Sequence, residues 1–232
     1  MFSSHSKHFA AGPPPLSAKA SQPIVCYVTD RKALPGDKSL PGLLDKIRDA
    51  AAAGVDWVQI REKDLSAHDL FGIVREAVAL ASVRVIVNDR LDVALAASAA
   101  GVHLGHASAS VREVIVWCRA GNAPTDFLVG VSCHSLNEAL EAEAAGASYT
   151  YFGPIFETPS KIPFGEPHGV EELAQVAKAA RIPVIAIGGA NQSNAAACIQ
   201  AGATGIAAIR MIQDASDAAT LKKAIDTIHR SR

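Results

Sequence analysis

The sequence predicts a single-domain α/β protein with the fold of a (β/α)8 (TIM) barrel. From residue 24 onward, short β-branched or apolar runs alternate with Ala-rich stretches of helical period, the pattern of a parallel sheet covered by helices. Eight such units can be counted, whereas an open doubly wound sheet seldom holds eight similar units. The chain has 232 residues, 49% of them hydrophobic, which suits a barrel of roughly 250 residues with one core.

Each predicted strand is a short apolar run followed by a polar cluster. The runs span residues 24–29, 55–60, 84–88, 101–104, 127–132, 148–152, 183–187 and 204–209. Segments of helical period lie between them, among them 40–54, 68–81, 91–101, 135–146 and 191–202. Four of these segments end in glycine, at Gly54, Gly101, Gly146 and Gly202. Glycine after the last periodic residue predicts a helix C-cap.

Composition sets the remaining expectations. Residues 1–22 mix Ser, Pro and Ala without periodicity, which predicts a flexible extension before a barrel domain at 23–232. The net charge is −1 with the charges interspersed, so neither a nucleic-acid patch nor a membrane-binding face is expected. The four cysteines form no C-x-x-C pair, and no run reaches the roughly 18 to 20 apolar residues of a membrane helix. We expect a cytoplasmic protein and leave a homo-oligomer open.

Polar residues after the second predicted strand are the first candidate site. In a barrel of this kind the chemistry lies where strands end and the following loops begin. Gln59, Arg61 and Lys63 alternate with Ile60 and Glu62, so strand geometry would turn the amide and both cations toward the barrel mouth. This arrangement predicts an anion clamp. The alternative is the solvated start of a helix.

The third and fifth predicted strands end in further candidates. Asn88 and Asp89 follow a buried run, and Asp89 would either N-cap the next helix or hold Mg²⁺ together with phosphate oxygens. At the end of the fifth strand, Ser132 and His134 are separated by a single residue. His134 would serve as an acid or base or in helix capping. His103, within the fourth strand, is interpreted as a barrel-interior residue.

The loops after strands six to eight predict a phosphate site. Thr158, Ser160 and Lys161 follow a Gly-Pro turn, where hydroxyls and a mobile cation suit a phosphate. Gly188 and Gly189 follow strand seven and Arg210 follows strand eight, the positions at which barrels commonly bind phosphate. A surface loop and close packing of the glycines are the alternatives.

Seven short motifs, in order along the chain, resemble the thiamine-phosphate synthase and thiazole tautomerase family. They are Y-V-T-D-R at 27–31, Q-I-R-E-K at 59–63, N-D-R at 88–90, G-V-H-L-G at 101–105, G-V-S-C-H-S at 130–135, G-P-I-F-E-T-P-S-K at 153–161 and I-G-G at 187–189. The ordered set covers about residues 24 to 215 and is more specific than any one motif.

The resemblance implies that 4-amino-2-methyl-5-pyrimidinylmethyl diphosphate is joined to 4-methyl-5-(2-phosphoethyl)thiazole, with Mg²⁺ as the cofactor. It places Asp89 on Mg²⁺ and Ser132 near the diphosphate. Around the pyrimidine diphosphate it places Gln59, Arg61, Lys63, Asn88 and Lys161. Around the thiazole phosphate it places Thr158, Ser160, Gly188, Gly189, Ile209 and Arg210. Arg61, Lys63, Ser132 and Lys161 would then stabilise charge during catalysis.

The sequence departs from the family pattern at one of the expected Mg²⁺ ligands. The family usually reads H-L-G-Q-x-D, with a second carboxylate for Mg²⁺, whereas this chain has His106 and Ser108 there. A hydroxyl from Ser108 or water would replace that ligand. Two rivals stay open, namely a thiazole tautomerase using His134 as acid or base and a barrel that binds phosphorylated ligands without catalysis.

Overall fold

The computed structural model describes residues 22–80, 83–158 and 166–231. Its strands form one closed parallel barrel in the order β1-β2-β3-β4-β5-β6-β7-β8. β1 pairs with β8 as well as with β2, which closes the ring. The predicted fold is therefore confirmed. The predicted extension lies outside the described residues, apart from Gln22.

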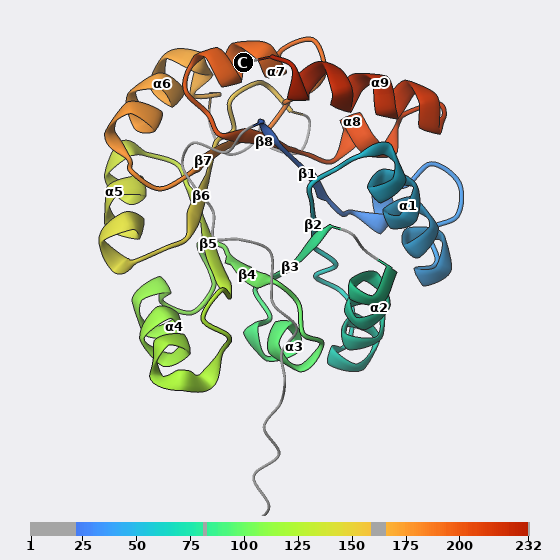
Figure 1. The fold of residues 1–232 in the computed structure, drawn as a ribbon, viewed down its shortest axis with the longest axis horizontal. Helices are drawn as coiled ribbons and strands as arrows, with labels where there is room; N and C mark the ends of the chain where they lie inside the picture. The colour runs from blue at the N-terminus through green and yellow to red at the C-terminus, as the bar shows by residue number, and fades with distance from the viewer. Residues whose placement is uncertain (1–21, 81–82, 159–165, 232) are drawn as a thin grey trace, which may run out of the picture.

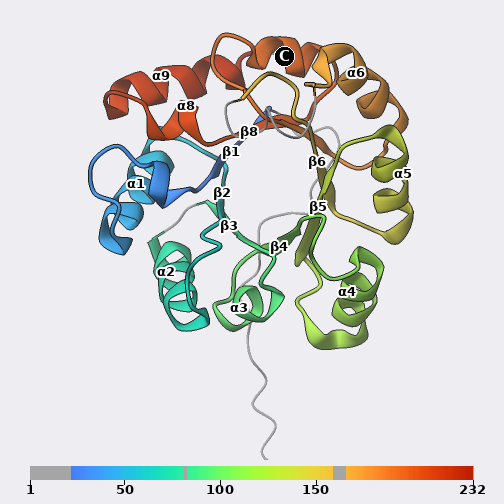
Figure 2. The ribbon, with the colours of Figure 1, turned by 180° about the vertical axis from the view of Figure 1, so that it is seen from behind.

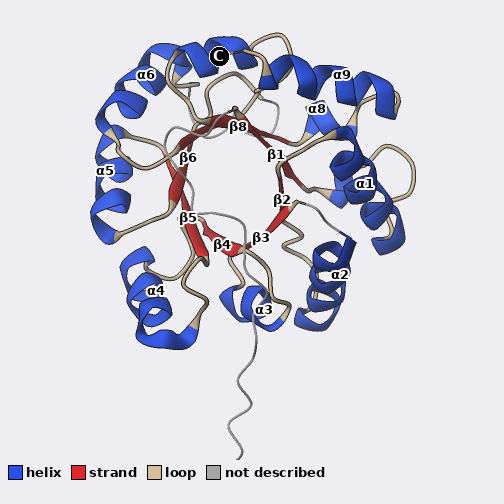
Figure 3. Cartoon of the chain, viewed as in Figure 1, coloured by secondary structure: helices blue, strands red, loops and turns tan. Residues whose placement is uncertain are grey.

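The strands fall where the apolar runs predict them, with ends shifted by at most two residues. They are β1 Ile24–Val28, β2 Trp57–Ile60, β3 Arg84–Asn88, β4 Gly101–Leu104, β5 Leu128–Cys133, β6 Tyr149–Phe152, β7 Val184–Ile187 and β8 Gly205–Ala208. In Figure 3 they form the central ring, with the helices outside it. All-parallel strands are covered on their outer face in this way because their outward side chains are apolar.

Helices follow the strands around the ring (Figure 1). The longer ones are α1 Leu40–Ala53, α2 Ala67–Leu80, α5 Leu136–Ala145, α6 Gly169–Ala179 and α9 Ala218–His229. The shorter ones are η1 Arg31–Ala33, α3 Leu91–Ala96, α4 Val111–Trp117, η2 Cys118–Asn122, α7 Ala195–Gln200 and α8 Arg210–Gln213. Seen from behind in Figure 2, α9 again lies beside α1, so the chain's last helix closes the outer layer over β1.

Glycine ends some of these helices, as predicted, but not all. Gly54 and Gly146 cap α1 and α5 with φ values of 104° and 94°, the left-handed conformation that glycine adopts without steric cost. The prediction for Gly101 is wrong, because Gly101 begins β4 and Ala97 caps α3. A methyl group on Gly101 would meet the carbonyl of Leu128 at 2.3 Å, so this glycine serves strand packing.

The barrel interior is filled by side chains that alternate along the strands with those of the outer core. The inner cluster includes Cys26, Trp57, Ile86, Tyr149 and Tyr151. Gly130 on β5 makes room for the Tyr149 ring, since a methyl group there would lie 2.0 Å from its Cζ atom. No described helix is long and apolar enough to cross a membrane.

Candidate active site

A row of hydrogen-bonded polar side chains joins the carboxyl ends of β2, β3 and β4. Gln59 Nε2 donates to Asn88 Oδ1 at 2.9 Å, and Asn88 Nδ2 donates to Asp89 Oδ2 at 2.6 Å. The Ser108 hydroxyl donates to Asp89 Oδ1. The structure thus brings together four predicted site residues that are far apart in sequence, and we call them the polar row.

Asp89 does not cap the following helix, so that alternative is wrong. α3 begins at Leu91, with Arg90 in the N-cap position. The backbone of Asp89 has φ 61°, a left-handed conformation that is uncommon outside glycine and most tolerated by Asn and Asp. Its N–H donates to the His103 carbonyl at 2.9 Å, and its Oδ1 accepts from Gly105 N at 3.2 Å. The backbone therefore presents the carboxylate to the loop after β4.

Oxygen donors suited to Mg²⁺ lie together at this point. Asp89 is exposed, and the Ser108 hydroxyl contacts its carboxylate. Mg²⁺ commonly takes one or two carboxylates and keeps several waters or phosphate oxygens as its other ligands. Among the described residues, no group of three or more His, Cys, Asp or Glu side chains is placed to hold a metal. The donor set therefore fits Mg²⁺ held by one carboxylate, and does not fit an all-protein cage.

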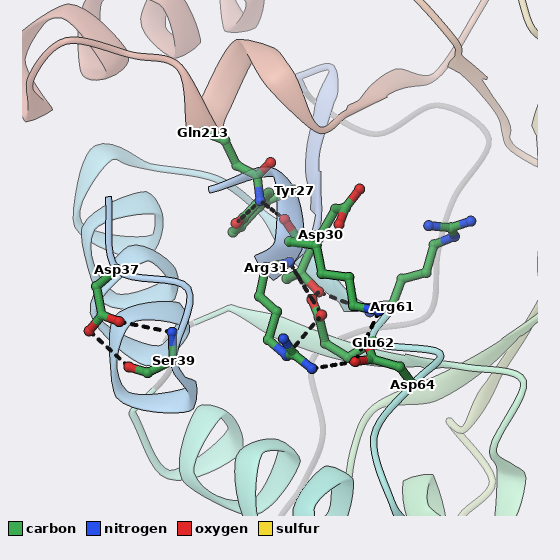
Figure 4. A network of polar contacts seen from close by, with 11 residues as sticks. Tyr27, Asp30, Arg31, Asp37, Ser39, Arg61, Glu62, Asp64 and Gln213 are labelled. Carbon is green, nitrogen blue, oxygen red and sulfur yellow. Dashed lines mark hydrogen bonds and ion pairs between the residues drawn. The ribbon is translucent and has the colours of Figure 1, made fainter. Parts of the chain in front are cut away.

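Arg61 and Lys63 lie beyond the end of β2, so strand alternation does not set their directions. β2 ends at Ile60, and Lys63 is an exposed residue in a turn. Figure 4 shows the Arg61 guanidinium pointing away from Arg31 and Asp64, whose side chains form an ion pair. The Arg61 side chain has no ion pair with any described residue, which leaves its charge available to an anion.

Glu62, between the two cations, is buried and ties β2 to β1. Its Oε1 accepts from the Thr29 hydroxyl at 2.7 Å and from Arg31 N at 3.1 Å. The Thr29 Oγ1 in turn accepts from Arg61 N at 2.9 Å. Burial raises the pKa of Glu62, although Thr29 and Arg31 act to lower it. Sequence reasoning missed the roles of Thr29 and Glu62, because a carboxylate inside a charged motif gives no signal that it is buried.

Ser132 lies at the end of β5 and contacts the buried His103 of β4. The distance from His103 Nε2 to Ser132 Oγ is 2.9 Å, and Tyr149 OH lies 3.2 Å from His103 Nδ1. His103 is 2% exposed, which confirms that it belongs to the barrel interior. Ser132 is partly exposed and is the outermost side chain of this cluster.

His134 belongs to the start of α5, but its side chain does not cap that helix. Ser135 is the N-cap and accepts from Glu138 N at 3.2 Å, while Glu138 accepts from His134 N at 2.7 Å. The ring Nδ1 is hydrogen-bonded to the Gly153 carbonyl. Since a carbonyl only accepts, Nδ1 carries a proton in this contact.

The loops after β6 and β7 are held against each other. Ile155 N donates to the Ile187 carbonyl and Phe156 N to the Gly188 carbonyl, both at 3.0 Å. Gly188 and Gly189 have φ values of 91° and 70°, and a methyl group on either would lie 2.6 Å from the β6 loop. Both glycines are thus packed closely against the loop after β6.

The other predicted phosphate ligands are placed only in part. Thr158 is partly buried at the end of the described β6 loop, and Ser160 and Lys161 lie outside the described residues. Ile209 packs on the inner cluster, and the exposed Arg210 begins α8. In the same region, Gln213 Nε2 donates to Tyr27 OH at 3.0 Å and to the Asp30 carbonyl at 2.9 Å (Figure 4).

These features define a (β/α)8-barrel protein with a polar site at the carboxyl ends of its strands. Residues 25–212 match the family model of thiamine monophosphate synthase. Thiamine-phosphate synthase from Roseiflexus sp. is 37% identical over 211 residues, covering 88% of this chain and 84% of that one. The enzyme of the same name from Methanocella arvoryzae is 40% identical over 189 residues, covering 79% and 87%.

A solved structure agrees with these relatives. Thiamine phosphate pyrophosphorylase from Pyrococcus furiosus superposes with a TM-score of 0.77 at 29% identity, covering 90% of this chain and 96% of that one. The chain therefore belongs to the thiamine monophosphate synthase family.

Proposed function

We propose that the protein is a thiamine-phosphate synthase. It would join 4-amino-2-methyl-5-pyrimidinylmethyl diphosphate to 4-methyl-5-(2-phosphoethyl)thiazole, giving thiamine phosphate and diphosphate. The family match over residues 25–212 supports this assignment. The observation in the structure that carries it is the polar row, which collects amides, a carboxylate and a hydroxyl at the carboxyl ends of β2, β3 and β4.

The reaction needs charge stabilisation and positioning, and no covalent enzyme nucleophile. The C–O bond to the diphosphate breaks and leaves a pyrimidinylmethyl cation, and the thiazole nitrogen then forms the C–N bond. Arg61, Lys63 and Lys161 would stabilise the charge that develops on the departing diphosphate, with a hydrogen bond from Ser132. Positioning the thiazole nitrogen beside the cation would supply much of the remaining rate acceleration.

The amides of the polar row suit the pyrimidine ring. Gln59 is 2% exposed, and its Oε1 accepts no hydrogen bond within the described part of the chain. A buried acceptor without a donor is costly, and the amino group of the pyrimidine would supply one. Asn88 would hold Gln59 in this orientation through its Oδ1 atom.

Asp89 and Ser108 would hold Mg²⁺, since their oxygens lie together at the loop after β4. Bound there, Mg²⁺ would neutralise charge on the diphosphate. Thr158, Ser160, Gly188, Gly189, Ile209 and Arg210 would surround the thiazole phosphate. The positive φ values of both glycines let the backbone approach such a phosphate closely.

The test is a coupling assay with purified protein, both substrates and Mg²⁺, following thiamine phosphate and diphosphate. We expect product that disappears on addition of EDTA and returns with excess Mg²⁺. Folded protein that forms no product at any Mg²⁺ concentration would contradict the proposal.

The second candidate, a thiazole tautomerase, is favoured by one observation. The His134 ring is held by a hydrogen bond from Nδ1 to the Gly153 carbonyl, and in a neutral ring held in this way Nε2 is the nitrogen that can accept a proton from a substrate. Isomerisation of a thiazole carboxylate phosphate without coupling, lost in His134→Ala, would establish this function instead. In a synthase, the same substitution should lower coupling only modestly.

A further inference from the structure

A line of hydrogen bonds runs from the inside of the barrel to its mouth through His103. Tyr149 OH lies 3.2 Å from His103 Nδ1, and His103 Nε2 lies 2.9 Å from Ser132 Oγ. Tyr149 and Tyr151 rings pack against the imidazole, with centroids 5.7 Å and 4.2 Å away. The imidazole is therefore fixed in place, with one nitrogen toward the interior and the other toward the site.

His103 is a neutral imidazole in this setting. It is 2% exposed, and both of its ring nitrogens contact hydroxyl groups and not carboxylates, a setting in which burial disfavours the charged form. Burial likewise raises the pKa of Tyr149 well above its usual value, so its hydroxyl keeps its proton. A neutral imidazole has one N–H and one acceptor nitrogen. The donor-to-acceptor direction of both hydrogen bonds in this line thus depends on which nitrogen of His103 holds the proton.

Only one of the two directions leaves the Ser132 proton free. If Tyr149 donates to Nδ1, then Nε2–H donates to Ser132 Oγ, and the Ser132 hydroxyl can donate to a ligand. If the proton is on Nδ1 instead, Nε2 accepts a hydrogen bond from the Ser132 hydroxyl, and the serine then presents only lone pairs to an anion. Hydrogen bonds to anionic oxygens are about twice as strong as neutral ones, so a bound diphosphate would select the first direction.

We propose that His103 is a positioning residue whose Nε2–H tautomer, held by Tyr149, turns the Ser132 proton toward the diphosphate. Both His103 and Tyr149 act through Ser132 and touch no substrate. The role of the diphosphate in this inference rests on the proposed function, whereas the tautomer is a property of the protein alone. The two can therefore fail separately.

The first test reads the tautomer directly. The full chain labelled with ¹⁵N-histidine is examined by long-range ¹H–¹⁵N NMR, with the His103 signals identified by their loss in His103→Gln. We expect the Nε2–H tautomer of a neutral ring, strengthened by Mg²⁺ with inorganic diphosphate, and a shift toward Nδ1–H in Tyr149→Phe. An Nδ1–H tautomer in the diphosphate-loaded protein would overturn the proposal, even in an active synthase.

The second test is a double-mutant cycle on kcat, with the KM of the thiazole phosphate as a separate readout. Tyr149→Phe should lower kcat about tenfold, the scale of one hydrogen bond, with that KM unchanged. In a Ser132→Ala background the same change should have no further effect. Equal losses in both backgrounds would show that Tyr149 acts structurally, and the inference would fail.

Tyr27→Phe is the matched control. It also removes a fully buried tyrosine hydroxyl, one that accepts from Gln213 Nε2 at 3.0 Å, but Tyr27 belongs to the outer core and not to the inner cluster. We expect its kcat to stay within twofold of the wild type. A tenfold loss there would attribute the effect to the general loss of a buried hydroxyl and overturn the role of Tyr149.

Discussion

The Thr29 hydroxyl donates to Glu62 Oε1 at 2.7 Å and accepts from the Arg61 N–H at 2.9 Å. One buried side chain directly after β1 thus holds the backbone of a cation that follows β2. The threonine uses both its donor and its acceptor capacity in these two contacts. The predicted anion clamp therefore depends on a residue outside the clamp itself.

Thr29→Val should weaken both stability and substrate binding. It is close to isosteric, yet it removes the acceptor of the Arg61 N–H and leaves the Glu62 carboxylate with Arg31 as its remaining partner among the described residues. The expected loss in free energy of unfolding is about 1–3 kcal/mol, measured by urea denaturation, with a raised KM for the pyrimidine diphosphate. Thr227→Val is the control, because Thr227 is exposed and its hydroxyl donates to the Lys223 carbonyl of its own helix. Equal stability of both variants would contradict the prediction.

Glu62 should make stability depend on pH. Burial raises its pKa above the ordinary value of 4.5, so the folded state holds this proton at a pH where the unfolded state has lost it. The Glu62 contribution therefore falls as pH rises from 4.5 to the raised folded value, and the cost is complete above that value. The free energy of unfolding of wild type minus that of Glu62→Gln should decline across this interval. A difference that grows with pH would contradict the assignment.

Substitutions at Asp89 and Ser108 should change the Mg²⁺ requirement in opposite directions. Asp89→Ala should abolish turnover, because it removes the carboxylate at the proposed metal position. Ser108→Asp adds a second carboxylate beside the first and should lower the Mg²⁺ concentration for half-maximal rate about tenfold. Asp92→Asn, which changes an exposed carboxylate paired with Arg90, is the control and should leave this concentration unchanged. Normal Mg²⁺ dependence in Asp89→Ala would remove Asp89 from the metal site.

Two glycine substitutions should have opposite effects on stability. In Gly130→Ala the new methyl group would lie 2.0 Å from Tyr149 Cζ, which should cost about 3 kcal/mol or more through overpacking. In Gly72→Ala, within α2, the methyl group meets no atom within 4 Å, and the gain should be about 0.5–1 kcal/mol. Both follow from urea denaturation. A tolerated Gly130→Ala would mean that the Tyr149 ring can move aside.

The sequence by itself determined the barrel, the approximate position of every strand and the polar residues at the strand ends. These features can be predicted because strands that are buried under helices must be short apolar runs. The last residue of each run then marks the carboxyl end of its strand. The sequence therefore predicts Gln59, Asn88 and Ser132 as residues of the barrel mouth.

Only the tertiary structure decided which of these residues touch. Glu62 is buried against Thr29, and Ser132 is paired with His103, across 33 and 29 residues of chain. Gly101 begins β4, and Arg90, not Asp89, occupies the N-cap position of α3. Such contacts depend on the register between neighbouring strands and on the backbone conformation of each loop. The local periodicity of the sequence contains neither the strand register nor the loop conformations, because both arise only when the barrel closes.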